Sequence, residues 1–107
     1  MWPPAFQVEW SRYMESVVAT LAGELDLATR PELDIALDKA IGEDVPTVVL
    51  DLADVTFVDA SSLRSFGEAA QRLRAEGRTL VLRNPSRLTR RLLAITDIDS
   101  VAIVEDP

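Results

Sequence analysis

Residues 47–52 (TVVLDL) are apolar at nearly every position. Such a run is typical of a strand that is covered on both faces, as in a parallel sheet. The segments on either side repeat apolar residues at the spacing of one helix face, which argues for helices before and after the strand. The helical residues before it are Leu33, Ala36, Leu37, Ala40 and Ile41, and those after it are Leu63, Phe66, Ala70 and Leu73. A strand between two amphipathic helices predicts an α/β fold.

Further strand patterns occupy residues 6–10, 17–22, 79–82 and 101–104. The first two are close enough to pair as a hairpin across a polar turn at residues 11–15. Residues 54–59 are predicted to be a short connection or a further extended piece. The element order is then β-β-α-β-α-β-α-β, which implies right-handed crossovers and a mixed, mostly parallel sheet of about five strands. Its N-terminal edge strand is antiparallel, and helices pack against the sheet.

Helix boundaries follow from residues with capping chemistry. Thr29 is predicted to cap the first helix, with Glu32 completing a capping box and Pro31 in the first turn, and Gly42 to end it. The second helix begins near Ser61 and stops at Gly77. Asn84 is predicted to cap the third helix, with Pro85 at its first position. The expected inward stripe of that helix is Leu88, Leu92 and Ile95.

The domain organisation is expected to be a short tail at residues 1–5 followed by one domain at residues 6–107. No apolar run approaches the ~20 residues that cross a bilayer. The start of the chain, Met1-Trp2-Pro3-Pro4, lacks the basic and then apolar pattern of a signal peptide. We therefore expect a cytoplasmic protein with no membrane insertion.

Composition removes several classes of function. The 107 residues include no cysteine and no histidine, which excludes a disulfide scaffold, thiol catalysis and a Ser-His-Asp triad. The net charge is −7, and residues 1–60 carry three basic and twelve acidic side chains. Phosphate contacts supply most nucleic-acid affinity, so this acidic half disfavours direct binding to nucleic acid. Arg83, Arg87, Arg90 and Arg91 cluster around the third helix, as a solvated face or as a contact for a partner or anionic lipid.

Acidic side chains gather at two strand-to-helix turns. One turn is residues 23–29 (GELDLAT), and the other is residues 58–63 (VDASSL). Functional groups of parallel α/β folds lie beyond the carboxyl ends of the strands, where helices also begin. We therefore expect the two turns to be neighbours in space although they are far apart in the chain.

At these turns the chain resembles the STAS domains, a family named for sulfate transporters and anti-sigma factor antagonists. The first family motif is an apolar strand ending in Gly-Glu-Leu-Asp, which is present at residues 21–26. The second is a Val/Leu-rich strand ending in Asp-Leu (48–52), followed by an Asp-Ser-Ser-Gly-Leu-like turn (59–63). A matching Gly and strand follow at 77–82. The resemblance runs from about Phe6 to Val104, and it implies a single STAS-like domain.

The resemblance implies a regulatory binding module rather than an enzyme, with no cofactor and no metal. In bacterial anti-sigma factor antagonists, the second serine of the turn is phosphorylated, and that serine corresponds to Ser61. The kinase is itself the anti-sigma factor, a serine kinase of the histidine-kinase-like ATPase type. A serine phosphatase reverses the modification. The unphosphorylated form binds the anti-sigma factor and so frees the sigma factor. Asp26, Asp59, Glu24 and Ser62 are the expected partner contacts.

This chain departs from the family turn at two positions. Ala60 replaces the first serine, and Ser62 replaces the glycine that follows the phosphorylated serine. The side chain of Ser62 would change how a kinase docks, or would offer a second hydroxyl, so Ser62 is the secondary candidate for phosphorylation.

Simpler structural roles remain open for the same residues. Ser61 and Asp59 are both suitable N-caps, and Asp26 is suited to an Asx-type turn. The alternative function is a STAS scaffold or adaptor that never carries phosphate, in a stress-signalling assembly or a lipid-transport complex. A phosphotransfer receiver is disfavoured, because it needs a lysine at a late strand end and Lys39, the chain's single lysine, lies in the first helix.

Overall fold

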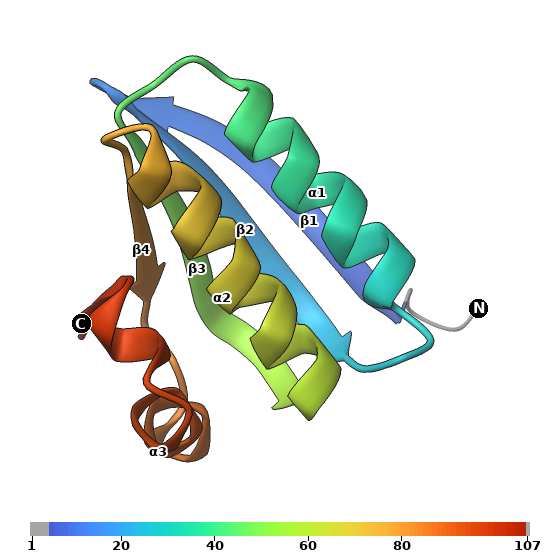
Figure 1. Ribbon diagram of the computed structural model, residues 1–107. Coiled ribbons are helices and arrows are strands. Elements are labelled where there is room, and N and C mark those ends of the chain that lie inside the picture. The colour runs from blue at the N-terminus through green and yellow to red at the C-terminus, as the bar shows by residue number, and fades with distance from the viewer. Residues whose placement is uncertain (1–4, 107) are drawn as a thin grey trace.

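The computed structural model describes residues 5–106, which form a five-stranded sheet in the order β1-β2-β3-β4-β5. β1 and β2 are an antiparallel hairpin, and the remaining neighbours are parallel. Figure 1 shows α1 and α2 side by side across one face of the sheet. The predicted α/β fold, with an antiparallel N-terminal edge strand and a mostly parallel sheet, is confirmed. The strands are β1 Phe6–Tyr13, β2 Ser16–Leu25, β3 Thr47–Val58, β4 Thr79–Arg83 and β5 Ile103–Glu105.

Within the same residues, three α-helices and one short 3-10 helix connect the strands. They are α1 Arg30–Gly42, α2 Ala60–Ala75, α3 Arg87–Ile95 and η1 Ile98–Ser100. None of these helices is long and apolar enough to span a bilayer. Residues 1–4 of the predicted tail lie outside the described residues. Ala5 is described, and its carbonyl accepts a hydrogen bond from the Glu24 N–H at 3.1 Å.

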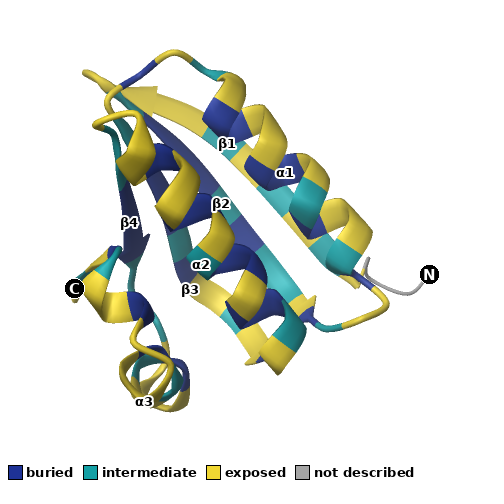
Figure 2. Ribbon diagram, viewed as in Figure 1, coloured by how far each residue is buried: buried dark blue, intermediate teal, exposed yellow. Residues whose placement is uncertain are grey.

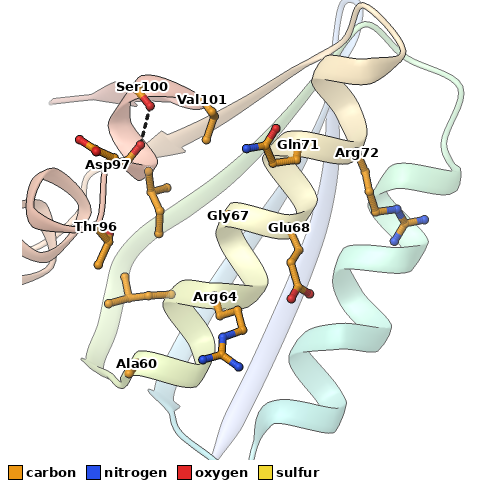
Figure 3. A pocket seen from close by; sticks show the side chains of 12 residues that line it. Ala60, Arg64, Gly67, Glu68, Gln71, Arg72, Thr96, Asp97, Ser100 and Val101 are labelled. Atoms are coloured by element: carbon orange, nitrogen blue, oxygen red, sulfur yellow. Dashed lines mark hydrogen bonds between the residues drawn. The ribbon is translucent and has the colours of Figure 1, made fainter.

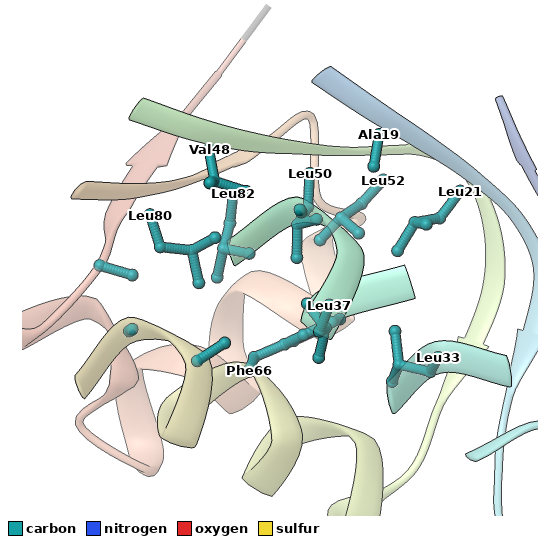
Figure 4. Close-up of a cluster of buried hydrophobic side chains, with 14 of the residues drawn as sticks. Ala19, Leu21, Leu33, Leu37, Val48, Leu50, Leu52, Phe66, Leu80 and Leu82 are labelled. Atoms are coloured by element: carbon teal, nitrogen blue, oxygen red, sulfur yellow. The ribbon is translucent and has the colours of Figure 1, made fainter. Parts of the chain in front are cut away.

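The main core lies between the sheet and the helices, and all three α-helices contribute to it. Figure 4 shows Leu21, Leu50 and Leu82 of the strands directed towards Phe66 and the α1 leucines. Every residue of the predicted inner faces of α1 and α2 is buried. Figure 2 shows exposed residues on the sides of both helices that face away from the sheet. Because 3.6-residue periodicity sets the helix face, these positions were predictable from sequence.

The apolar run in β3 is buried on both faces for two different reasons. Residues of β3 alternate between the faces of the sheet. Val48, Leu50 and Leu52 lie in the main core under the helices. On the other face, Val49 lies in register between Val18 of β2 and Val81 of β4, and these three valines form a second small cluster. Cross-strand neighbours, rather than a second layer of helices, bury that side of the run.

Several predicted boundaries are wrong. β1 continues to Tyr13, so the hairpin turn is only residues 14–15, with Met14 at φ +56°. Of the two alternatives predicted for residues 54–59, the extended piece is present rather than the connection, and residues 54–58 continue β3 as one strand beyond its predicted end. The extension follows from pairing with β2, which carries the ladder to Leu25 and Val58 through two register shifts.

One predicted cap is right in position only, and another is wrong. Thr29 is the N-cap residue of α1, but its side chain makes no cap hydrogen bond, and its hydroxyl instead donates to the Glu24 carbonyl at 2.7 Å. α3 begins two residues after Pro85, and Ser86 is its N-cap, accepting from Thr89 N–H at 3.1 Å. Asn84 instead adopts φ +57° and donates its N–H to the Glu105 carbonyl.

The C-terminal ends of the helices differ from each other. Gly77 ends α2 as predicted, at φ +72°, where the Arg78 N–H reaches the Leu73 carbonyl and the Gly77 N–H reaches the Arg74 carbonyl. This pair of bonds is a Schellman motif. Gly42 is the last residue of α1 rather than a left-handed cap, and the chain leaves through Glu43 in an extended conformation.

The third helix buries a different face from the one predicted. Thr89 and Leu93 are its buried residues, whereas Leu88 and Ile95 of the predicted inward stripe are 64% and 71% exposed. Leu92, the third residue of the predicted stripe, packs partly against the core. α3 packs at the end of the sheet, so only a narrow face of it meets the core, and hydrophobic periodicity alone placed that face about a quarter turn away.

Gly23→Ala is expected to destabilise the protein by roughly 2 kcal/mol or more, because strain and a backbone clash both act there. Gly23 has φ +107°, and a Cβ at this position would lie 2.2 Å from the Ala5 carbonyl oxygen. Urea unfolding measures the effect. Gly42→Ala is the matched control. A Cβ there meets nothing within 4 Å, and we expect a gain of up to about 1 kcal/mol. Equal effects of the two substitutions would refute this account of Gly23.

Candidate functional site

The two acidic turns lie side by side at the carboxyl edge of the sheet, as the sequence predicted. Leu25 and Val58 end β2 and β3 as a register pair. One residue further on, the Asp59 N–H donates to the Leu25 carbonyl at 2.9 Å. Asp26 therefore follows one member of the last pair and Asp59 follows the other. This ladder brings the start of α1 next to the start of α2.

Asp59 is the N-cap of α2. Its backbone is extended, and its Oδ1 accepts from the Ser62 N–H at 2.9 Å and from the Ser61 hydroxyl at 2.8 Å. Partial burial by itself raises the pKa of Asp59, but the hydrogen bonds from Ser62 and Ser61 outweigh this and hold the pKa below its usual value. One carboxylate oxygen thus fixes both the helix start and the Ser61 side chain.

Ser61 lies in the first turn of α2, at the second helical position, and is half-buried. Ser61 does not cap the helix, so the alternative in which Ser61 serves only as the N-cap is wrong. Its hydroxyl is held by Asp59, and the first turn of a helix leaves backbone N–H groups without an intrahelical partner. A phosphate on Ser61 would be near those N–H groups and near a carboxylate at the same time.

Ser62, the residue that replaces the family glycine, faces the interior. Its side chain is fully buried, and its hydroxyl has no hydrogen-bond partner within the described residues. The backbone N–H of Ser62 serves the Asp59 cap. This burial argues against Ser62 as a second phosphate acceptor and against direct contact of its side chain with a partner.

The Asp26 turn is held by reciprocal hydrogen bonds with Thr29. Asp26 Oδ1 accepts from the Thr29 N–H at 3.0 Å, and the Asp26 N–H donates to Thr29 Oγ1 at 3.0 Å. Asp26 therefore has the local structural role considered for it, although its carboxylate accepts from the N–H three residues on rather than two as in an Asx-type turn. Glu24 is exposed on β2, and its backbone carbonyl accepts from the Thr29 hydroxyl of the same turn.

Two exposed apolar side chains at this edge were not singled out from the sequence. Leu27 follows Asp26 and is 74% exposed, and Phe57 pairs with Glu24 and is 52% exposed. Exposed apolar groups beside carboxylates are typical of protein-binding surfaces. The sequence offered little indication that these two side chains are exposed, because the segments that contain them are equally consistent with buried strand ends.

A groove runs from this edge along α2. It has a volume of about 930 Å³ and is lined by one face of α2 and by residues 96–101 around η1. Figure 3 shows Ala60, next to Ser61, at one end of the groove and Thr96 and Asp97 across from α2. Gly67 lines the α2 wall of the groove. A Cβ added at Gly67 would lie 3.6 Å from Cγ1 of Ile98 in η1. Among residues 5–106, no three His, Cys, Asp or Glu side chains gather as a metal-binding group.

Comparisons with known proteins give consistent results. A family model described as "Mlab, STAS domain" matches residues 10–105. An anti-sigma factor antagonist from Mycobacterium paratuberculosis has a similar structure, with a TM-score of 0.79 and 25% identity over 94% of this chain and 85% of that chain. No curated protein matches the chain in sequence.

SpoIIAA, an anti-sigma factor antagonist and cell fate determinant of Bacillus, has been solved in two forms that resemble this chain. The phosphorylated form has a TM-score of 0.73 and 26% identity over 96% of this chain and 91% of that chain. The unphosphorylated form has a TM-score of 0.69 and 28% identity over 85% of this chain and 83% of that chain.

The depressed pKa of Asp59 predicts a specific pH dependence of stability. A lowered folded-state pKa contributes stability that is complete above the unfolded value of about 3.9 and is lost as the pH falls through the folded value. The advantage of the wild type over Asp59→Asn should therefore be full at neutral pH and should shrink below about pH 4.

Urea unfolding of both proteins across this range measures the difference. Asp59→Ala, which also removes the cap, should cost about 0.5–2 kcal/mol at neutral pH. A constant difference between wild type and Asp59→Asn at all pH values would show that the carboxylate charge contributes nothing to the cap.

Proposed function

The chain belongs to the STAS family, and from that membership we propose that it is an anti-sigma factor antagonist switched by phosphorylation of Ser61. The unphosphorylated chain binds an anti-sigma factor that is also its serine kinase, of the histidine-kinase-like ATPase type, and so releases a sigma factor. A serine phosphatase restores the binding form. The chain itself performs no catalysis, uses no cofactor and acts in the cytoplasm.

The observation that carries this proposal is the position of Ser61. Its hydroxyl is presented at the start of α2 and bonded to Asp59, at the edge where the Asp26 turn also lies. SpoIIAA, to which the chain is 26–28% identical, exists in an unphosphorylated and a phosphorylated form. Together these support Ser61 as the residue through which this chain is controlled.

Electrostatics support a switch rather than a permanent phosphate site. Phosphate adds about −1.5 to −2 charges at pH 7. The Ser61 oxygen is 2.8 Å from a carboxylate oxygen of Asp59, and it loses its proton on modification. Two unit charges about 4 Å apart repel by about 4 kcal/mol at an effective dielectric of ~20, whereas a helix N-terminus returns only about 0.3–1 kcal/mol. Phosphorylation therefore breaks the Ser61–Asp59 bond and places repelling charge beside the cap of α2, which changes the contact surface at the start of that helix.

The proposed partner surface is the edge formed by the two turns. Asp26, Asp59 and Glu24 supply negative charge, and Leu27 and Phe57 supply exposed apolar area. Such a surface fits a partner that presents basic groups around an apolar centre. Ser62 enters this proposal only through its backbone, since its side chain is buried.

One feature supports the alternative, a STAS scaffold or adaptor that is not phosphorylated. Ser62 stands where the family has glycine, and its buried side chain changes the turn that a kinase would have to reach. The two functions differ in whether Ser61 ever carries phosphate, so phosphate mapping separates them.

Ser61→Ala should abolish phosphorylation and leave partner binding largely intact, because binding belongs to the unmodified form. The lost hydrogen bond to Asp59 should cost about 0.5–1.5 kcal/mol of stability. Ser61→Asp should weaken binding, but less than phosphate does, because it carries roughly half the charge. The measurement incubates each variant with ATP and each purified histidine-kinase-like ATPase of the same genome, and maps phosphate by mass spectrometry.

Ser62→Ala is the matched control and should change phosphorylation little, while Ser62→Gly, which restores the family residue, should leave it equal or faster. Phosphate on Ser62 with Ser61 unmodified would move the site by one residue. No phosphate on either serine, with tight binding to a partner, would favour the scaffold function.

Asp26→Asn should weaken binding of the same kinase without a comparable loss of stability. The amide oxygen can still accept from the Thr29 N–H, so the turn is kept while the charge is removed. Asp26→Ala removes the acceptor as well and should also destabilise the turn. Titration calorimetry and urea unfolding report the two effects separately. Unchanged affinity for Asp26→Asn would limit Asp26 to its structural role.

A further inference from the structure

One side of α3 carries an apolar stripe that the core uses only in part. Leu88, Leu92 and Ile95 follow the i, i+4, i+7 spacing of one helix face. Leu88 is 64% exposed, Ile95 is 71% exposed, and Leu92 between them is half-buried. Thr89 and Leu93 anchor the neighbouring face of α3 in the core and Leu92 packs partly against it, so Leu88 and Ile95 are the members of the stripe that stay exposed.

The basic residues around this stripe fall into two groups. Arg83 pairs with Glu105 at 3.1 Å, and Arg90 pairs with Asp106, so the C-terminal carboxylates neutralise both. Arg87 and Arg91 are exposed on α3 and make no ion pair with any residue in the range 5–106. The helix therefore leaves two free positive charges directly beside exposed aliphatic side chains.

The α3 surface is continuous with the proposed phosphorylation site. α3 ends at Ile95, and the next residues, Thr96 and Asp97, line the groove opposite Ala60 and Arg64 of α2. Ala60 precedes Ser61. In Figure 3, Thr96 and Ala60 lie on opposite walls of the same groove. A partner seated over Ser61 and the groove thus reaches the end of α3.

We propose that α3 is a second contact for the partner that recognises Ser61, and that it receives an amphipathic segment of that partner with Asp or Glu residues beside its apolar ones. The inference rests on the proposed function. The partner segment should be acidic because it would meet Arg87 and Arg91 beside the stripe. The part of the partner that meets the Asp26 and Asp59 edge should instead carry basic groups. The partner is then expected to present opposite charges to the two ends of the groove.

A membrane is a weaker candidate for this surface. A nine-residue helix with two well-exposed aliphatic side chains buries little area in lipid, and a chain of net charge −7 is repelled by an anionic bilayer. A protein partner meets only the local charge of α3, because salt screens interactions beyond about 8 Å.

The test compares two isoleucines of almost equal exposure on two helices. Ile95→Ser removes the most exposed side chain of the α3 stripe, and Ile35→Ser removes a 69%-exposed side chain from α1. Titration calorimetry uses the kinase that phosphorylates Ser61. We expect Ile95→Ser to weaken binding about tenfold and Ile35→Ser by less than about twofold, since interface energy concentrates in a few buried side chains. Arg91→Gln should make the affinity less dependent on salt than in the wild type.

Equal affinities for wild type and Ile95→Ser, with Ser61 still phosphorylated, would overturn this inference and leave the proposed function standing. Absence of any binding kinase would overturn both. Wild-type binding to phosphatidylglycerol vesicles that Ile95→Ser abolishes, without an effect on kinase affinity, would assign the stripe to a membrane and also overturn it.

Discussion

The hydrogen bond from the Asp59 N–H to the Leu25 carbonyl joins the ends of β2 and β3, and the candidate site exists because of it. The pairing of these strands runs through two register shifts before it reaches Leu25 and Val58. The second shift lies at Gly23, whose positive φ lets the backbone pass within reach of the Ala5 carbonyl. Without that pairing, the Asp26 turn and the start of α2 would be two unrelated loops.

Asp59 couples the switch residue to the fold. The same oxygen that caps α2 also holds the Ser61 hydroxyl, so a charge placed on Ser61 acts first on the helix start. The rest of α2 is anchored independently, by the fully buried Phe66 and Leu73 and by a hydrogen bond from Ser65 to Asp34 of α1 at 2.9 Å. Phosphorylation is therefore expected to change the surface and the first turn of α2 while the packing of the domain is retained.

The sequence was informative wherever local chemistry and burial agree. The inner faces of α1 and α2 and the meeting of the two acidic turns followed from periodicity and parallel topology. Asn84 was misassigned because it adopts a left-handed backbone and its N–H donates to Glu105 of β5, a long-range contact that no local pattern reveals. Ser86, two residues later, is an equally good cap. The α3 stripe was assigned inward because periodicity defines an apolar face but not which side the core covers. The burial of Ser62 likewise depends on the packing of α2 against the sheet.

The central claim is that modification of Ser61 controls binding by breaking the Ser61–Asp59 hydrogen bond and disturbing the start of α2. The most direct measurement is titration calorimetry of the kinase with the unphosphorylated chain and with the chain phosphorylated at Ser61, together with amide NMR spectra of both forms. We predict that phosphate weakens binding at least about tenfold, equivalent to about 1.4 kcal/mol, with shift changes confined to the start of α2 and residues 24–29. Equal affinities of the two forms would contradict the account, as would shift changes spread through the core.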